Sequence, residues 1–300
     1  MRCLALAQAW EGPVRFVSLE PPDWVRERLT REGFELSEQE DFTGATWVLV
    51  DGYHFTADYL RAIPAPVVFL DDTPRLPEYP VRWVWNPNIS APRDYGSTPA
   101  LLGPAYYPLR REFWPYALRP REHPEQARRL LITMGGADPA GFTFVAVAAA
   151  RRLELELRVI VGGSNPARAR LAPLLAKDEL VPGGDDMASL LSWGELALAA
   201  SGVTSYELAF LGVPMVLVAL ADNQVPVALG LQAAGAAVYL GETPPEDTVA
   251  RALRQLANDR GERTGQSRAV RRLIDGMGVR RVAARLRGDP AAACEQDQSE

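Results

Sequence analysis

The 300 residues, of which 47% are hydrophobic, are enough to bury two cores of ordinary domain size. No run of about 18 uncharged apolar residues predicts a membrane span. The formal net charge of −6 argues against a nucleic-acid partner, because neutralising phosphates requires a basic surface. Cys3 and Cys294 show no metal-type spacing and no stretch is typical of a signal peptide. We therefore expect a cytoplasmic protein with free thiols and with neither a metal nor a cofactor.

The first part of the chain predicts an alternating α/β domain over residues 1–115. Helical spacing opens the chain, and further elements follow at strand 13–19, helix 21–33 and strands 47–50, 67–70 and 82–85, with loop over 86–108. A doubly wound sheet normally begins with a strand in its middle, whereas this chain begins with a helix that nothing caps. We expect that the first strand is missing and that the product starts roughly 15 to 20 residues upstream. The alternative is a fold that simply begins with a helix.

A proline-rich, polar stretch over 116–127 predicts a linker, in which we expect His123 to be a solvated surface residue. Residues 128–288 then predict a second doubly wound domain, and 289–300 a disordered tail. Its strands are expected at 129–133, 157–161, 180–184, 196–200, 215–220 and 236–240, and its helices at 141–152, 166–176, 186–193, 204–211, 245–258 and, as an arginine-rich terminal pair, 267–288.

Two turns of the second domain are candidates for binding an anion. Gly135 and Gly136 follow its first strand and precede a helix, where backbone amides can approach a diphosphate; a plain tight turn is the alternative. Residues 201–204 offer a second set of helix-start amides. Glu207 either binds a pair of sugar hydroxyls or completes a capping box with Thr204.

The first domain offers the only side chains that we consider for catalysis, and only as weak candidates. Asp51, Tyr53 and His54 follow one predicted strand, and residues 71–72 are two aspartates that follow the next. Carboxyl ends of parallel strands are where ligands usually bind. A tyrosine and a histidine in a satisfied surface loop are the alternative interpretation.

Several ordered motifs resemble one family of enzymes, the UDP-sugar hydrolases that make pseudaminic acid precursors, which includes spore-coat polysaccharide proteins. The likeness is carried by MGGADP at 134–139, by DDMASLLSWGELALAASGVTSYELAFLGVP at 185–214 with the following ADNQ, and by VDGYHFTADY, FLDD and LLGPAYYPLRREF in the first domain. It covers the chain to about residue 240. A more distant likeness is to the GT-B glycosyltransferases that add N-acetylglucosamine in peptidoglycan synthesis.

The resemblance implies an α/β fold of GT-B type, with two Rossmann-like doubly wound domains facing a cleft and the nucleotide on the second. It implies hydrolysis of a UDP-linked diacetamido-trideoxy sugar by water at the anomeric carbon. It also places a catalytic histidine in a Gly-His turn that would precede Met1. A small-molecule nucleotide sugar is the expected partner, with neither nucleic acid nor membrane. The residues implied for the diphosphate are Gly135, Gly136, Gly202, Val203 and Thr204; for the ribose, Glu207; and for the sugar, Asn223 and Gln224.

Two other functions stay open at this point. A non-catalytic nucleotide-sugar-binding subunit would keep the second-domain site without the chemistry, and a GT-B glycosyltransferase would use a UDP-amino sugar as donor.

Overall fold

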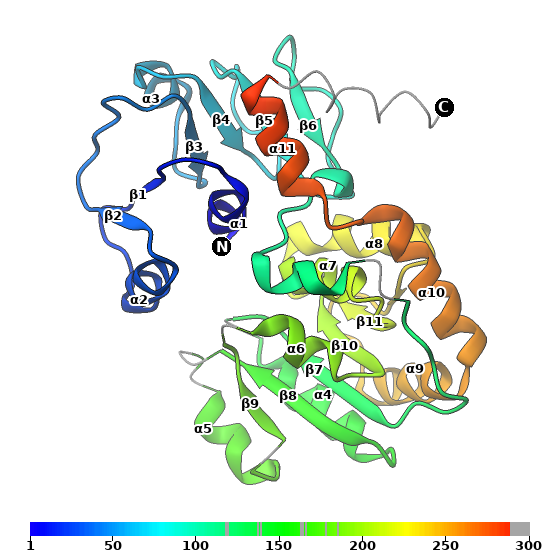
Figure 1. The fold of residues 1–300 in the computed structure, drawn as a ribbon. Coiled ribbons are helices and arrows are strands. Elements are labelled where there is room, and N and C mark those ends of the chain that lie inside the picture. The colour runs from blue at the N-terminus through cyan, green and yellow to red at the C-terminus, as the bar shows by residue number, and fades with distance from the viewer. Residues whose placement is uncertain are drawn as a thin grey trace. The chain divides into compact units, whose positions relative to one another are not determined.

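The chain divides into two compact units in a computed structural model that describes residues 1–117, 120–136, 138, 140–162, 165, 167–177, 179–184 and 186–288 (Figure 1). Unit 1 comprises Met1–Arg111 together with the chain from Met277, and unit 2 is Glu112–Gly276. The tail predicted at 289–300 lies outside the described residues. No helix in these ranges combines the length and the apolar character that crossing a membrane requires.

Unit 2 contains a six-stranded, fully parallel sheet in the order β12-β11-β10-β7-β8-β9. Successive strands run outward from β7 in one direction and, after β9, from β10 in the other, so the switch point lies between β7 and β10. The predicted second doubly wound sheet is confirmed. Its strands are β7 (Arg129–Thr133), β8 (Glu156–Val161), β9 (Leu180–Pro182), β10 (Leu196–Ala200), β11 (Met215–Val218) and β12 (Val238–Tyr239).

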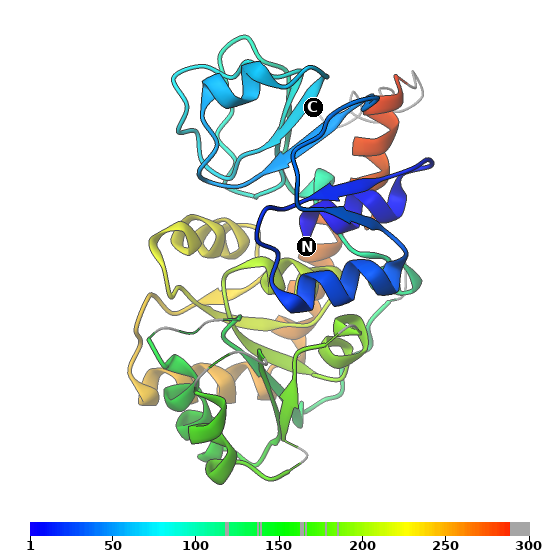
Figure 2. The same ribbon diagram turned by 90° about the vertical axis from the view of Figure 1, so that its left-hand side faces the viewer.

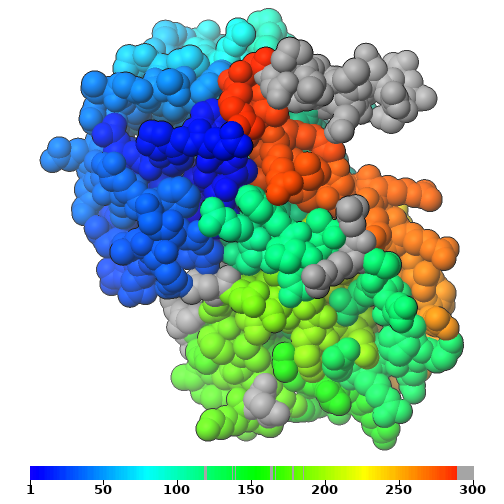
Figure 3. All heavy atoms as spheres, in the orientation of Figure 1, coloured from blue at the N-terminus to red at the C-terminus, as the bar shows by residue number. Residues whose placement is uncertain are grey.

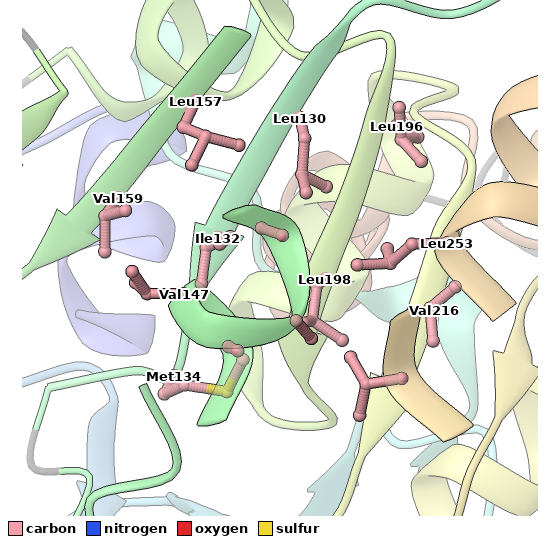
Figure 4. Close-up of a cluster of buried hydrophobic side chains, with 14 of the residues drawn as sticks. Leu130, Ile132, Met134, Val147, Leu157, Val159, Leu196, Leu198, Val216 and Leu253 are labelled. Atoms are coloured by element: carbon pink, nitrogen blue, oxygen red, sulfur yellow. The ribbon is translucent and has the colours of Figure 1, made fainter. Parts of the chain in front are cut away.

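Apolar side chains fill both faces of this sheet, which is why its central strands are continuous hydrophobic runs. Alternate residues such as Leu130 and Leu198 meet α4 and α9 in one core (Figure 4). The intervening Leu131 and Ala197 are equally buried, and α7 covers β10 and β11 and packs in turn on α10. The helices are α4 (Phe142–Arg151), α5 (Arg168–Leu171), α6 (Met187–Ser192), α7 (Val203–Phe210), α8 (Val225–Ala233), α9 (Glu246–Asn258) and α10 (Arg260–Leu273), with 3-10 turns η2 (Arg111–Tyr116), η3 (Ala172–Leu174) and η4 (Asp222–Gln224).

Unit 1 contains two separate parallel sheets, drawn as distinct ribbons in Figures 1 and 2. The larger has the order β3-β4-β5-β6, and the smaller pairs β1 with β2. Its strands are β1 (Arg15–Val17), β2 (Glu35–Ser37), β3 (Val48–Asp51), β4 (Val67–Leu70), β5 (Trp83–Asn86) and β6 (Ala100–Leu102), and its helices are α1 (Arg2–Ala9), α2 (Asp23–Glu32), α3 (Ala57–Ala62), the 3-10 turn η1 (Pro104–Tyr106) and α11 (Gly278–Arg287).

The last helix returns to the beginning of the chain. Helix α11 packs on α1 and η1, and Figure 3 shows the red residues near the end of the chain against the blue residues at its start. Gly278 makes this approach possible, because a Cβ at that position would lie 2.3 Å from the carbonyl oxygen of Tyr107. We predicted residues 278–288 within the second domain; the structure instead divides the expected helix pair, with α10 in unit 2 and α11 in unit 1.

Four short elements of unit 1 and one helix of unit 2 were not predicted from the sequence. Strand β2 and helix α3 fall in stretches for which no element is expected, β6 and η1 lie inside the predicted loop 86–108, and α8 follows the predicted site. Strands β2 and β6 have three residues each. A run of three residues is too short for a period of two to be recognised.

His123 is buried in unit 2, so its predicted solvated position is wrong. Its exposed fraction is 6%, and its Nε2 atom lies 2.8 Å from the Oγ atom of Ser267. Since the Ser267 hydroxyl donates to the carbonyl of Gly212, the imidazole Nε2–H is the donor in this pair. Burial, together with the charges of Arg121 and Arg263, lowers the pKa of His123 to about 4. The imidazole is therefore neutral at physiological pH and holds the linker in place.

A buried arginine fixes the same stretch from another side. The guanidinium of Arg263, with no exposed surface, donates to the carbonyls of Leu256 and Ala257 at the end of α9. It also donates to the carbonyls of Pro124 and Glu125. The segment predicted as a linker is thus bound to the first turn of α10.

Candidate functional site

Two turns emerge side by side at the switch point of the unit 2 sheet. Strand β10 pairs with β7 in a register that sets Ala199 opposite Thr133. The chain therefore leaves the sheet through Gly135–Gly136 on one strand and through Ser201–Gly202 on its neighbour. Both glycines of the first turn are exposed, and Gly135 has a φ of +77°, a conformation that favours glycine. The structure thus brings together the two turns that were predicted to bind an anion.

The first of these turns leads to a helix whose opening amides already have an anionic partner. The buried carboxylate of Asp138 accepts from the amides of Phe142 and Thr143 at 2.9 and 3.0 Å, and from the Thr143 hydroxyl at 2.5 Å. Asp138 adopts a φ of +40° to reach them. The start of α4 is therefore closed by the protein itself. Among the described residues of this turn, the backbone of Gly135 and Gly136 is what remains to bind a ligand.

The second turn leads to a helix of different design. The N-cap of α7 is Gly202, which has no side chain with which to accept from the helix amides. The amide of Thr204 lies in the first turn of α7. Amides of a first turn have no helix carbonyl four residues earlier to which they can donate. Because α7 begins at Val203, Thr204 lies inside the helix, so the capping-box alternative for Glu207 is wrong. Glu207 lies in the second turn of α7 and is buried, with 5% of its surface exposed.

The loop that follows β11 lies against the start of α7. The Gln224 Oε1 atom accepts from the amide of Leu220 at 2.9 Å, which fixes the orientation of the side-chain amide. Its Nε2 atom then lies 3.8 Å from the position that a Cβ would take on Gly202. The Ser201 hydroxyl lies 3.0 Å from the carbonyls of both Val218 and Gln224. The side-chain amide of Gln224 therefore lies beside the start of α7 at the switch point.

The remaining predicted residues of this loop are at the surface. Asn223 and its neighbour Asp222 are exposed and form the start of η4, ahead of α8. No hydrogen bond from the Asp222 carboxylate caps α8, whose N-cap is Gln224.

Unit 1 has its own polar cluster at the carboxyl ends of β3 and β4. The Arg2 guanidinium binds Asp51 and Asp72, with N–O distances of 2.6 Å to each. Tyr53 and Asn88 donate to Asp72 at 2.6 and 2.8 Å. Burial and the hydrogen bond to Asp72 raise the pKa of Tyr53 to about 12. Burial by itself would raise the pKa of Asp72, but the charge of Arg2 and the hydrogen bonds to the carboxylate lower it.

Of the three weak catalytic candidates, two are held in this cluster. Asp51 is an ion-pair partner of Arg2, and Tyr53 keeps its proton across the physiological range. His54 is exposed, with its ring centroid 4.0 Å from that of Phe55. Of these three candidates, His54 is therefore the one whose side chain is outside the cluster around Arg2. Asp71, predicted beside this edge, is buried and accepts from Tyr79 at 2.6 Å, and burial raises its pKa.

Comparison with known proteins agrees with this architecture. No protein-family model matches the chain. Spore coat polysaccharide biosynthesis protein SpsG of Bacillus subtilis is 26% identical over 195 residues, which are 62% of this chain and 55% of that protein. The match thus spans about half the length of this relative.

Solved structures extend the likeness to both units. MurG of Acinetobacter baumannii superposes with a TM-score of 0.66 and 16% identity, over 96% of this chain and 95% of that one. MnaA of S. aureus, in a structure with UDP, gives a TM-score of 0.62 with 16% identity, over 96% and 92% of the two chains. The sequence is therefore similar to the SpsG-like spore-coat polysaccharide proteins, as the motifs predicted, and the chain has an α/β fold of GT-B type built from two domains.

Proposed function

We propose that the protein binds a UDP-linked diacetamido-trideoxy sugar through unit 2 and hydrolyses it at the anomeric carbon, releasing UDP for surface polysaccharide or nonulosonic acid biosynthesis. Three observations support this: the similarity to SpsG, the shared fold with a UDP-bound protein, and the amide donors at the switch point. The start of α7 carries the proposal. Helix starts at such a point are where parallel sheets of this kind usually hold phosphates.

The binding roles follow from where each group lies. The backbone at Gly202, Val203 and Thr204 would face the diphosphate, with Gly135 and Gly136 opposite. The side-chain amide of Gln224 and that of the exposed Asn223 would reach the sugar, and Glu207 would accept from the ribose hydroxyls. We assign no phosphate-binding role to the start of α4, because its amides of Phe142 and Thr143 already donate to Asp138.

Hydrolysis requires two further contributions from the protein besides binding. UDP is a good leaving group once its charge is stabilised, and a base must orient the attacking water. Among the described candidates for the base, His54 is the one that we propose to test first, since Asp51 and Tyr53 are engaged with Arg2 and Asp72.

The decisive binding experiment is titration of the protein with UDP and with 2′-deoxy-UDP. If Glu207 holds the ribose, removal of the 2′-hydroxyl weakens binding to the wild type by about tenfold, the effect of one lost hydrogen bond to a charged group. The same change has no effect on Glu207→Gln, since that interaction is already lost. Glu242→Gln, at an exposed glutamate, is the control that should match the wild type. No heat with UDP would refute the proposal.

A GT-B glycosyltransferase is the second candidate, because the superposition on MurG is as extensive as any reported above. The two are distinguished by supplying a UDP-amino sugar and measuring UDP release in water alone and with an added sugar acceptor. A hydrolase releases UDP at the same rate in both. A transferase releases it only with the acceptor, and a binding subunit in neither.

A further inference from the structure

The loop between β3 and α3 carries His54 and is held by one arginine side chain. The carbonyl oxygens of Gly52, Tyr53 and Phe55 all accept from the guanidinium of Arg75. The N–O distances are 2.8 Å to Gly52 and Tyr53 and 3.1 Å to Phe55. The Cζ atom of the same guanidinium lies 5.9 Å from the centroid of the Tyr53 ring. One side chain therefore binds the loop backbone on both sides of His54.

Arg75 is itself fixed by partners in unit 1. Its Nε atom lies 3.3 Å from the Oδ1 atom of Asp71, whose side chain has no exposed surface. The other oxygen of Asp71 accepts from the Tyr79 hydroxyl at 2.6 Å, and this hydroxyl accepts from the Arg75 amide at 3.0 Å. The guanidinium Cζ atom also lies 5.2 Å from the ring centroid of Phe69, in β4. The loop after β3 is thus anchored to the end of β4.

The position of the His54 imidazole depends on this anchored backbone. The ring lies against that of Phe55, with 4.0 Å between the two centroids. It also lies over Gly52, where a Cβ would be 3.1 Å from the His54 Cε1 atom. Both neighbours belong to the loop that Arg75 holds. A change in the backbone of this loop would therefore move the imidazole.

We propose that Arg75 is a positioning residue that fixes the imidazole of His54, through the loop carbonyls, for a role as base. The inference rests on the function proposed above, because it requires His54 to orient the attacking water. Arginine suits this task because its planar guanidinium presents five N–H donors in a fixed fork, whereas the ammonium of lysine is a point charge on a flexible stem. Arg75→Lys would keep a positive charge beside Asp71 and lose the simultaneous bonds to three carbonyls.

The first test measures the anchoring independently of activity. The chain has two histidines, so isotope-labelled histidine gives two Cε1–H signals in an NMR spectrum, and His123→Gln assigns them. In the wild type, the ring of Phe55 should displace the His54 signal from the position of free histidine. In Arg75→Lys this signal should move toward the free position. In Arg82→Lys, the control at an exposed arginine, it should stay in place. An unchanged His54 signal in Arg75→Lys would overturn the proposal.

The second test measures UDP release from a UDP-amino sugar. A misplaced catalytic group can cost about 100-fold in rate, so Arg75→Lys should lose about this much in kcat. The KM should not change, because the nucleotide is proposed to bind through unit 2. In a His54→Gln background, Arg75→Lys should cause no further loss, since both variants remove the same contribution. A further loss in that background would show that Arg75 does not act through His54.

Gly52→Ala tests the same loop without removing the charge beside Asp71, and it serves if Arg75→Lys folds poorly. Its Cβ would lie 2.9 Å from the Phe55 Cε2 atom and 3.1 Å from the His54 Cε1 atom. This variant should therefore shift the His54 signal and lower kcat as Arg75→Lys does. A shifted signal with the kcat of the wild type would refute the inference.

Failure of the inference and failure of the proposed function give different results. If the wild type releases no UDP, the proposed function fails and the role of Arg75 fails with it. If the wild type releases UDP and His54→Gln is equally active, hydrolysis stands and the role of Arg75 alone is refuted.

Discussion

Replacing Gln224 by glutamate should raise the stability of the free protein and weaken its binding of UDP. The substitution keeps an Oε atom to accept from Leu220 and exchanges the Nε2 group beside Gly202 for a second carboxylate oxygen. The new negative charge would face the start of α7. Because helix starts favour anions, it would take the place that we propose for the diphosphate.

The two effects have different sizes. A carboxylate at the first turn of a helix typically adds about 0.3–1 kcal/mol to the free energy of unfolding. Against a bound phosphate at about 6 Å, with an effective dielectric constant of about 20, the same charge costs roughly 3 kcal/mol. This is about a 100-fold rise in the Kd for UDP. Salt should reduce the loss, since it screens exposed charges.

Calorimetric titration with UDP and chemical denaturation without it measure the two effects separately. Gln232→Glu is the matched control, because the Gln232 Oε1 atom also accepts from a backbone amide, that of Tyr239, at the far end of α8. This control should bind UDP as the wild type does. If Gln224→Glu binds UDP with unchanged affinity, no phosphate lies at the start of α7 and the assignment fails.

Three further predictions test the structure of the two units. Since the pKa of buried His123 is about 4, below its ordinary value of about 6.5, the unfolded chain binds this proton first. The free energy of unfolding should therefore fall by up to about 1.4 kcal/mol per pH unit from pH 6.5 down to 4, and urea denaturation of His123→Gln should show a shallower fall. Gly278→Ala should destabilise unit 1 severely, because the new Cβ would overlap with Tyr107. Its control, Gly265→Ala, has open space around α10 and should raise the Tm slightly. Equal Tm values for the two variants would refute the packing of Gly278 on Tyr107. Asp138→Ala should lower the free energy of unfolding by about 2–4 kcal/mol in denaturant titration, because the cap is lost and the φ is unfavourable for alanine. Asp138→Asn keeps a side-chain acceptor and should cost distinctly less; an equal loss would refute the role of these hydrogen bonds.

The architecture of unit 2 could be predicted because its signals are local. The strands at 129–133 and 196–200 contain the apolar runs 130–132 and 196–200, and the helices between them have regular apolar spacing. Alternation of strands and helices then allows few topologies, of which the observed doubly wound order is the common one. The carboxyl-edge positions of Gly135, Gly202 and Gln224 follow directly from that order.

The contacts that were missed depend on partners far along the chain. His123 is buried by Ser267, which is 144 positions away, and the polar residues around His123 favour an exposed loop. The spacing of α11 predicts an apolar face without indicating that α1 covers it. The left-handed conformation of Asp138 and its hydrogen bonds to the start of α4 likewise have no signal in the sequence.

The two-part composition of unit 1 affects how the protein is made. Unit 2 is one continuous stretch, Glu112–Gly276, and can fold as soon as it leaves the ribosome. Unit 1 instead waits with α1 uncovered until α11 has been translated, which at about 10 residues per second takes on the order of 20 seconds. Nascent chains that stall before residue 278 would therefore expose the apolar side of α1, and we expect chaperones and proteases to act on this intermediate.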